Sequence, residues 1–471
     1  MTEIPIINGT YTDNLGNMRT SYPHNLRPIP LGQGISKQYL RPVEGIVQNA
    51  VIATEGFVRG GINWDGVLYR VVGSDLISIA MDGTITTLGS VGNDQRPVSF
   101  DYSFDRLSIT SNGGLFYYSS TLGLIQVTDP DLGSVKDHIW VDGYFMAIDD
   151  ENIVVTNLGS PTVIDPLKYG SSEADPDPTI AILKVRNEPH VLNRYTIEVF
   201  QNVGGSVFPF SVVEGATVRR GAVGTYMCTV FQEALAFVGS GRNESVSVWM
   251  SSGGQTVKIA TREIDIILHA IDESTLANLV MENRTHEGLE LLYIHLPTIT
   301  LVYDAAATQE TGQHVWYTLG SGIVKNTEYE GRYHVWCYNR WNVGSPNTKK
   351  MGYLVDTDGD QFGVTVGWQF DTDIVYNEGR GAIIHELELV ALPGRIAVGT
   401  TGVVQTQWSY DGQTWSMVKA VSAGTSGERS KRLLWLQQGH MKDRRIQRFI
   451  GTSDVRLTFL RLNATLEPLG V

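Results

Sequence analysis

Short apolar runs, separated by dipeptides that form tight turns, recur along the chain from about residue 50 to residue 360. Val67–Val72, Leu76–Met81 and Thr84–Leu88 are three successive runs, broken by Gly73-Ser74 and by Asp82-Gly83. An Asp-Gly pair between apolar runs is a strong signal for a β-hairpin. Because such runs have the length and spacing of short antiparallel strands, the pattern predicts an all-β sandwich, barrel or propeller.

The grouping of these runs favours a propeller-like main domain over the other all-β arrangements. Three or four runs return together roughly every 40–50 residues, which is the repeat length of a propeller blade. We therefore predict a propeller-like domain over residues 46–362. No WD or kelch signature accompanies the repeat, so other β arrangements remain open and the number of blades is undetermined.

A short stretch with helical spacing interrupts the strand pattern near residues 263–281. Glu263–Ala270 and Glu273–Met281 carry apolar residues at three- and four-residue intervals. Asp272 lies where an N-cap would, and Glu273 follows in the first turn, where the helix dipole favours an acid. The side chains expected to face the body are those of Leu276, Leu279 and Val280. The stretch predicts a packed helical insertion.

The two ends of the chain differ from this middle region. Five prolines, at positions 5, 23, 28, 30 and 42, fall within residues 1–45. Proline disrupts regular helix and central strand, so this segment is predicted to be an extended arm lying on the body or on a neighbour. Residues 363–471 again carry strand-length runs and a hairpin turn at Tyr410–Gln413, and they predict a C-terminal β-sandwich.

Composition indicates a folded chain whose basic residues gather at one end. Apolar residues make up 42% and charged residues 18% of the 471 residues, a balance that argues against disorder. The formal net charge of −14 disfavours tight, sequence-independent binding to DNA. Residues 421–471 carry nine Lys or Arg and four acids, so this segment is +5 and the remaining chain is −19.

Cysteine usage and the lack of targeting segments predict a soluble protein made in a reducing cytoplasm. Cys228 and Cys337 are too few for a disulfide framework and are expected to be buried thiols. No window of 18 consecutive apolar residues is present, and the N-terminus lacks the basic start and apolar core of a signal peptide. We expect no membrane contact.

The common catalytic and cofactor motifs are absent from the sequence. There is no P-loop, no His-Glu-x-x-His zinc site and no Gly-x-Ser-x-Gly elbow. Asp356, Asp358 and Asp360 resemble the start of a calcium loop, but Gln361 and Gly367 stand where an EF-hand needs Gly and Glu. A polar turn is the favoured interpretation, with cation binding left open. We predict no catalytic, cofactor-binding or metal residues, and a protein that is not an enzyme.

Ser409-Tyr-Asp411-Gly412-Gln-Thr414-Trp415 is similar to the Asp-box hairpins of sialidases and sugar-binding β proteins. It is one residue short of that form and occurs once. We expect Asp411 to stabilise a turn through backbone amides and Trp415 to pack beneath it. The alternative function that this hairpin leaves open is a carbohydrate-binding or glycan-cleaving β-propeller, which would need paired carboxylates in one cleft to cleave.

The basic residues near the C-terminus have three possible roles. They could form a solvated face, an interface for acidic protein surfaces, or a contact with DNA. In the run from Arg444 to Phe449, strand alternation places Arg444 and Arg448 on one face and Arg445 on the other. Charge on both faces suggests that at least one of them meets a partner or solvent.

Four segments carry a resemblance that covers nearly the whole chain. They are Tyr39-Leu-Arg41 followed by Gly45-Ile46, Gly221-Ala-Val-Gly-Thr-Tyr226, Leu291-Leu-Tyr-Ile-His-Leu-Pro297 with Leu301–Ala305, and Arg432-Leu-Leu-Trp435 with Arg444-Arg445-Ile446. They resemble the packaged-DNA stabilisation proteins, or tail hubs, of lambdoid short-tailed bacteriophages. The chain departs from that family around residues 166–180 and 340–362, where partner contacts are therefore in doubt.

The resemblance implies a structural virion protein of the phage tail, assembled in the host cytoplasm. Such proteins form a homo-hexamer that closes the portal channel, retains packaged DNA, and links the portal adaptor ring to the tail needle and tailspikes. Double-stranded DNA would pass through without sequence-specific binding, and no cofactor is implied. The candidate interface residues are Tyr39, Leu40, Arg41, Arg429, Lys431, Arg432, Arg444, Arg445 and Arg448.

Overall fold

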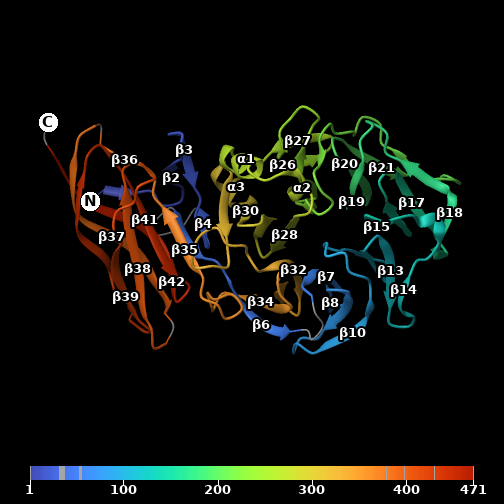
Figure 1. Cartoon of the computed structure of the whole chain (residues 1–471), viewed down its shortest axis with the longest axis horizontal. Coiled ribbons are helices and arrows are strands. Elements are labelled where there is room, and N and C mark those ends of the chain that lie inside the picture. The colour runs from blue at the N-terminus through green and yellow to red at the C-terminus, as the bar shows by residue number, and fades with distance from the viewer. Residues whose placement is uncertain are drawn as a thin grey trace.

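The chain folds into a β-propeller followed by a β-sandwich, which lie side by side along the long axis of the molecule (Figure 1). The computed structural model describes residues 2–30, 38–51, 56–377, 379–396, 398–428 and 430–469. The predicted all-β fold class is therefore confirmed.

Seven sheets, counted over the described residues, form the blades of the propeller. The first four blades consist of β7 (Val58–Trp64), β8 (Val67–Val72), β9 (Asp75–Ile79) and β10 (Ile85–Ser90); β11 (Ser99–Tyr102), β12 (Leu107–Ser111), β13 (Gly114–Ser119) and β14 (Gly123–Gln126); β15 (Asp137–Val141), β16 (Tyr144–Ile148), β17 (Asn152–Asn157) and β18 (Ser160–Ser171); and β19 (Thr179–Val185), β20 (Glu188–Asn193), β21 (Ile197–Asn202) and β22 (Phe210–Val212). The last three consist of β23 (Gly221–Ala222), β24 (Cys228–Phe231), β25 (Ala234–Ser240), β26 (Ser247–Ser252) and β27 (Gln255–Lys258); β28 (Val280–His286), β29 (Leu289–His295), β30 (Thr300–Asp304) and β31 (Val315–Leu319); and β32 (Arg332–Cys337), β33 (Arg340–Gly344), β34 (Lys350–Val355) and β6 (Gly45–Val51).

The ring closes through a strand from the other end of the propeller sequence. The innermost strand of each blade, which is β24 in the fifth, contacts the innermost strand of the next, and β32 of the last blade contacts β7 of the first. The outermost strand of the last blade is β6, which precedes the first blade in the sequence and pairs antiparallel with β34. Because the two ends of the propeller share one sheet, the ring is held shut by backbone hydrogen bonds.

Tight turns on the inner side of the blades explain why the short apolar runs form hairpins. In six blades the innermost strand is joined to the strand that follows it by two residues that both have positive φ, as a type I′ turn requires. These pairs are Asp65-Gly66, Asp142-Gly143, Arg186-Asn187, Gln232-Glu233, Glu287-Gly288 and Tyr338-Asn339. The turns match the right-handed twist of the strands, so the hairpins form locally.

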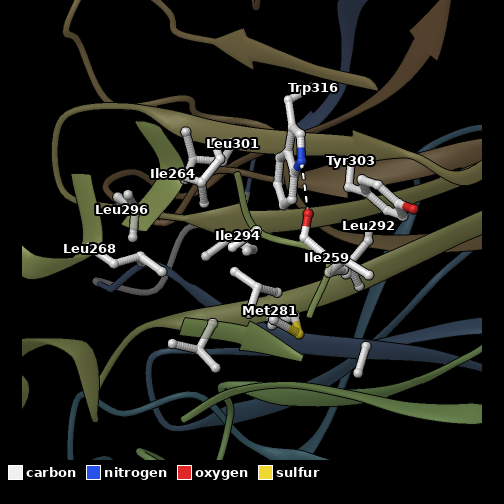
Figure 2. Close-up of a cluster of buried hydrophobic side chains, with 14 of the residues drawn as sticks. Ile259, Ile264, Leu268, Met281, Leu292, Ile294, Leu296, Leu301, Tyr303 and Trp316 are labelled. Carbon is white, nitrogen blue, oxygen red and sulfur yellow. Dashed lines mark hydrogen bonds between the residues drawn. The ribbon is translucent and has the colours of Figure 1, made fainter. Parts of the chain in front are cut away.

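The largest apolar cluster lies between the fifth and sixth blades and the helices that connect them (Figure 2). Leu292, Ile294 and Leu301 come from the sixth blade, and Ile264 and Leu268 come from α1 (Arg262–His269). The indole of Trp316 donates a hydrogen bond to the carbonyl of Ile259 at 3.2 Å. The polar edge of this buried ring is thereby satisfied.

The predicted helical insertion is confirmed in its first half and shortened in its second. The side chain of Thr261 caps α1 by accepting the amide of Ile264. The second helix, α2 (Glu273–Leu276), has Asp272 at the N-cap position but without a side-chain capping bond. The predicted helix to Met281 is wrong beyond that point, because residues 280–286 form β28, the innermost strand of the sixth blade. A third helix, α3 (Ala305–Thr311), was not predicted; Asp304 caps it.

The β-sandwich consists of two sheets around a separate apolar core. One sheet contains β4 (Leu26–Pro30), β5 (Gln38–Pro42), β42 (Val455–Pro468), β37 (Ala382–Ile396), β40 (Leu433–Met441) and β1 (Thr2–Ile4). The other contains β35 (Gly367–Asp371), β36 (Val375–Tyr376), β41 (Arg444–Thr452), β38 (Thr401–Ser409) and β39 (Lys419–Thr425). Trp368, Phe370, Trp435, Phe449 and Phe459 form the aromatic centre of the core.

The N-terminal segment corrects the expectation of an irregular arm. Residues 2–4, 26–30 and 38–42 are strands of the sandwich, and β2 (Gly9–Thr12) pairs with β3 (Met18–Ser21) as a separate hairpin. Pro28 and Pro30 are tolerated because β4 is the edge strand of its sheet. Strands from residues 1–45 thus complete a sheet of the sandwich that residues 363–471 form. The division of the chain into domains 1–45, 46–362 and 363–471 stays a proposal.

Candidate functional site

The innermost strands of all seven blades surround a central cavity of about 500 Å³. Several ionisable side chains line it, among them Asp101, Asp137, Lys184, Glu282 and His334. Carboxylates gathered in a cavity can indicate catalysis. Their hydrogen bonds show instead that they join neighbouring blades.

Two carboxylates on inner strands accept backbone amides from the next blade. Asp101 on β11 accepts the N–H of Trp140 at 2.6 Å, and Asp137 on β15 accepts the N–H of Ile182 at 3.0 Å. Burial raises the pKa of Asp137 to about 6. These bonds satisfy amides at the seam between two sheets, where the sheets themselves offer no partner.

Glu282 on β28 makes the densest of these connections, between the sixth and seventh blades. Its carboxylate accepts the backbone N–H groups of Tyr333 at 3.1 Å and His334 at 2.8 Å, and the Nε2 of His295 lies at 2.6 Å. Burial alone would raise the pKa of Glu282, but the interactions with His334 and His295 outweigh it and hold the pKa well below its usual range. Glu282 is therefore ionised at neutral pH.

The other seams are bridged by side chains that donate to backbone carbonyls. The bridging pairs are Arg59 to Arg96 at 2.6 Å, Thr225 to Ile180 at 2.8 Å, Asn283 to Val230 at 2.6 Å, and Asn63 to Trp336 at 2.8 Å. Together with the carboxylates, they place a side chain-to-backbone bond at each of the seven seams between described blades. The polar bonds at these seams therefore stiffen the ring of blades.

Acidification should destabilise the protein because buried histidines are held neutral. Burial lowers the pKa of His138 and His295 to about 4 and of His24 to about 3. An unfolded histidine titrates near 6.5, so between about pH 6.5 and 4 the unfolded chain takes up protons that the folded chain refuses, and stability falls. Asp137, with its raised pKa, opposes this loss with a smaller shift. Thermal unfolding followed from pH 7 to 4.5 should show a falling midpoint; a flat profile would contradict this assignment.

The structure places the three N-terminal candidate interface residues on β5 in different environments. Leu40 has no exposed area and packs in the sandwich core, paired with Phe459. Tyr39 is half-buried, and the guanidinium of Arg41 lies 2.7 Å from Asp356 at the surface. Leu40 therefore cannot serve as a contact residue in the folded chain, whereas the exposed part of Arg41 remains available.

Two arginines of the C-terminal run are used inside the chain. Arg445 is 1% exposed, donates to the carbonyl of Gln438 at 2.8 Å and lies over the ring of Trp408; burial lowers its pKa to about 10. Arg448 forms a two-pronged ion pair with the buried Asp371 at 2.7 and 2.8 Å. Arg445 is therefore a core residue, and the prediction that its side chain lies at an interface is wrong.

The remaining basic candidates lie on the surface of the sandwich. Lys431 and Arg444 are exposed, and Arg432 pairs with Glu388 at 2.7 Å. Arg429 lies outside the described residues. An interface role for Tyr39, Arg41, Lys431, Arg432, Arg444 and the partly exposed Arg448 stays a prediction.

The two loops that resembled ligand-binding motifs are engaged in structural contacts. Asp356 pairs with Arg41, and Asp358 accepts the amides of Gly359 and Asp360. Among the described residues no group of three His, Cys, Asp or Glu side chains could hold a metal ion. Asp411 accepts the amides of Gln413 and Thr414, as predicted for a turn; Trp415 stacks on Arg448 at 3.6 Å.

The seam residues that stiffen the ring were not predicted from the sequence. An isolated Asp, Asn or Thr on a short strand has no distinguishing pattern, and the run Glu282-Asn283-Arg284 has no spacing that marks it as a contact between blades. Both predicted buried thiols, Cys228 and Cys337, are free and buried. In the part of the chain that is described, no helix is long and apolar enough to cross a membrane.

Two family models match the chain in succession. The β-propeller of bacteriophage P22 Gp10 matches residues 2–359, and the β-sandwich of the same protein matches residues 367–467. The chain is 25% identical over 480 residues to the tail hub protein gp10 of Salmonella phage P22, covering 95% of each protein. Solved structures resemble the chain more loosely. The N-terminal domain of Nup159 is 8% identical, and the similarity covers 66% of this chain and 95% of that one, with a TM-score of 0.42. The Neurospora crassa Pan2 WD40 domain is also 8% identical, covers 66% of this chain and 94% of that one, and has a TM-score of 0.42. The chain belongs to the bacteriophage P22 Gp10 family and is a structural protein of a phage tail, not an enzyme.

Proposed function

We propose that the chain is a hexameric tail hub that closes the portal channel, retains packaged DNA, and links the adaptor ring to the tail needle and tailspikes. The observation that carries the proposal is the match to a tail hub protein over 95% of both chains. Because the match includes propeller and sandwich together, it supports a hub role for the whole chain and not for one domain alone.

The physical properties of the fold support a role as a closure. Polar bonds at every described seam between blades hold the propeller of each copy rigid. A rigid subunit can resist the pressure of packaged DNA without rearranging. The net charge of −14 disfavours adhesion to the phosphate backbone. DNA that is held by a plug without being bound can leave once the plug opens. Closed six-fold rings need two different complementary patches on each copy.

Addition of the purified chain to tail-less phage heads tests this role. Heads that carry portal and adaptor rings but lack a hub should gain a six-fold density below the adaptor, visible by cryo-electron microscopy. Packaged DNA in those heads should become protected from nuclease. Heads that receive buffer, or the heat-denatured chain, provide the control. Intact binding of the chain with no gain in nuclease protection would contradict the DNA-retaining role, and no binding at all would contradict the hub assignment.

A further inference from the structure

A basic patch lies on the sandwich, around β36 and the start of β41. Arg380, Lys442 and Arg444 are exposed, and Tyr376 beside them is 64% exposed. Tyr376 and Arg444 are paired across β36 and β41, and the amide of Asn377 donates to the carbonyl of Asp443 at 3.3 Å. The residues therefore form one surface. This patch, Arg380, Lys442, Arg444 and Tyr376, stands out because the rest of the chain is acidic.

The charge of the basic patch is only partly balanced locally. Asp443 is the acid within it, and its Oδ1 accepts the backbone amide of Arg444, which keeps the carboxylate turned toward the chain. The carboxylate of Glu467 lies 2.6 Å from the Nε2 of His385 and forms a pair with that side chain. Exposed cations beside an aromatic ring are typical of protein-binding surfaces that receive carboxylates.

An acidic cavity lies in the propeller. It has a volume of about 630 Å³ between the third and fourth blades, at the end of β18. The carboxylates that line it are those of Asp150, Glu151, Glu173, Asp175 and Asp177. Two cations reach them from within the chain, since Lys136 pairs with Asp150 and Arg242 pairs with Asp175 at 2.6 Å. The cavity therefore keeps an excess of negative charge.

β36, which carries Tyr376, belongs to the sandwich, and β18, whose end borders the cavity, lies on the side of the propeller away from the sandwich (Figure 1). We propose that the basic patch docks into the acidic cavity of a second copy of this chain. Complementary patches on two separate domains of one chain produce a head-to-tail contact, the type of interface from which cyclic rings are built. The inference rests on the proposed function and names the contact between neighbouring copies of the hub.

A charge-exchange experiment on the full chain tests this contact. The double variant Lys442→Glu/Arg444→Glu should self-associate at least roughly tenfold more weakly than the wild type in sedimentation velocity at low salt, because like charges then meet. The variant Glu151→Lys/Glu173→Lys should be weakened equally. An equal mixture of the two variants should recover association, since each reversed end then meets its opposite. The matched control Lys419→Glu/Arg262→Glu changes the charge equally at exposed positions outside the patch and should behave like the wild type.

The outcomes separate this contact from the hub assignment. Zero-length carbodiimide cross-linking of mixed 14N- and 15N-labelled protein should join Lys442 of one copy to an acid of the cavity in another. A wild type that stays monomeric at low salt up to about 100 µM, or variants that associate as it does, would overturn the proposed contact. Loss of duplex DNA binding instead of self-association would identify DNA as the partner and also overturn it. Variants that still form six-fold rings on tail-less heads would overturn this contact alone and leave the hub function standing.

Discussion

Replacing Glu282 by alanine should cause a large loss of stability in the propeller. The substitution leaves the amides of Tyr333 and His334 without their acceptor and removes the partner of His295 in a buried place. Breaking such a buried charged network typically costs about 3–5 kcal/mol. For a domain of roughly 300 residues this corresponds to a fall of about 5–10 °C in the unfolding midpoint, measured by calorimetry at pH 7.

Two matched variants show whether the seam or the charge is responsible. Glu287→Ala removes the same side chain at the turn that ends β28, where Glu287 is 82% exposed, and should leave the midpoint nearly unchanged. Glu282→Gln keeps one acceptor oxygen for the amides but loses the charge, so its midpoint should fall between those of wild type and Glu282→Ala. Equal midpoints for Glu282→Ala and Glu287→Ala would show that the seam does not hold the blades together.

The strands of the propeller were predictable because each blade forms mainly from neighbours in sequence. Val67–Val72 matches β8 residue for residue, and the Asp82-Gly83 turn separates β9 from β10 as expected. Closure of the ring was not predictable, because β6 pairs with β34 about 300 residues later. No local pattern encodes which distant edge a strand will meet, so the blade number emerged only from the fold.

The helical and N-terminal errors have a common cause in tertiary context. Helical spacing continues to Met281, but the amide of Met281 donates to the carbonyl of Tyr226 in the neighbouring blade, and the strand outcompetes the helix. Likewise, Pro28 would exclude a central strand but is compatible with the sheet edge that β4 occupies. The interface prediction failed at Arg445, because its guanidinium is stabilised by the Gln438 carbonyl and the Trp408 ring from other strands and by the Gln447 side chain on its own strand.

Asn25 is the residue whose replacement should most directly uncouple the sandwich from the propeller. Its side-chain NH2 donates to the carbonyls of Gly320, in the propeller, at 2.9 Å and of Gly367, in the sandwich, at 2.7 Å. Its Oδ1 accepts the amide of Gly320 at 3.1 Å. Asn25 is 4% exposed and has a φ of 53°, a conformation that asparagine tolerates better than alanine.

Asn25→Ala should lower stability by about 3–5 kcal/mol, from three lost hydrogen bonds, the buried groups left unpaired and the strained backbone. Because the propeller and the sandwich have separate apolar cores, we expect calorimetry to resolve two unfolding transitions in the variant. Asn25→Gly relieves the backbone strain but not the missing bonds, so it should also split the transition. Asn187→Ala, at an exposed turn position with a φ of 67°, provides the matched control and should keep the wild-type profile. A wild-type profile for Asn25→Gly would mean that the amide does not couple the two units, and that the ion pairs around Arg27, Arg41 and Arg456 suffice to hold them.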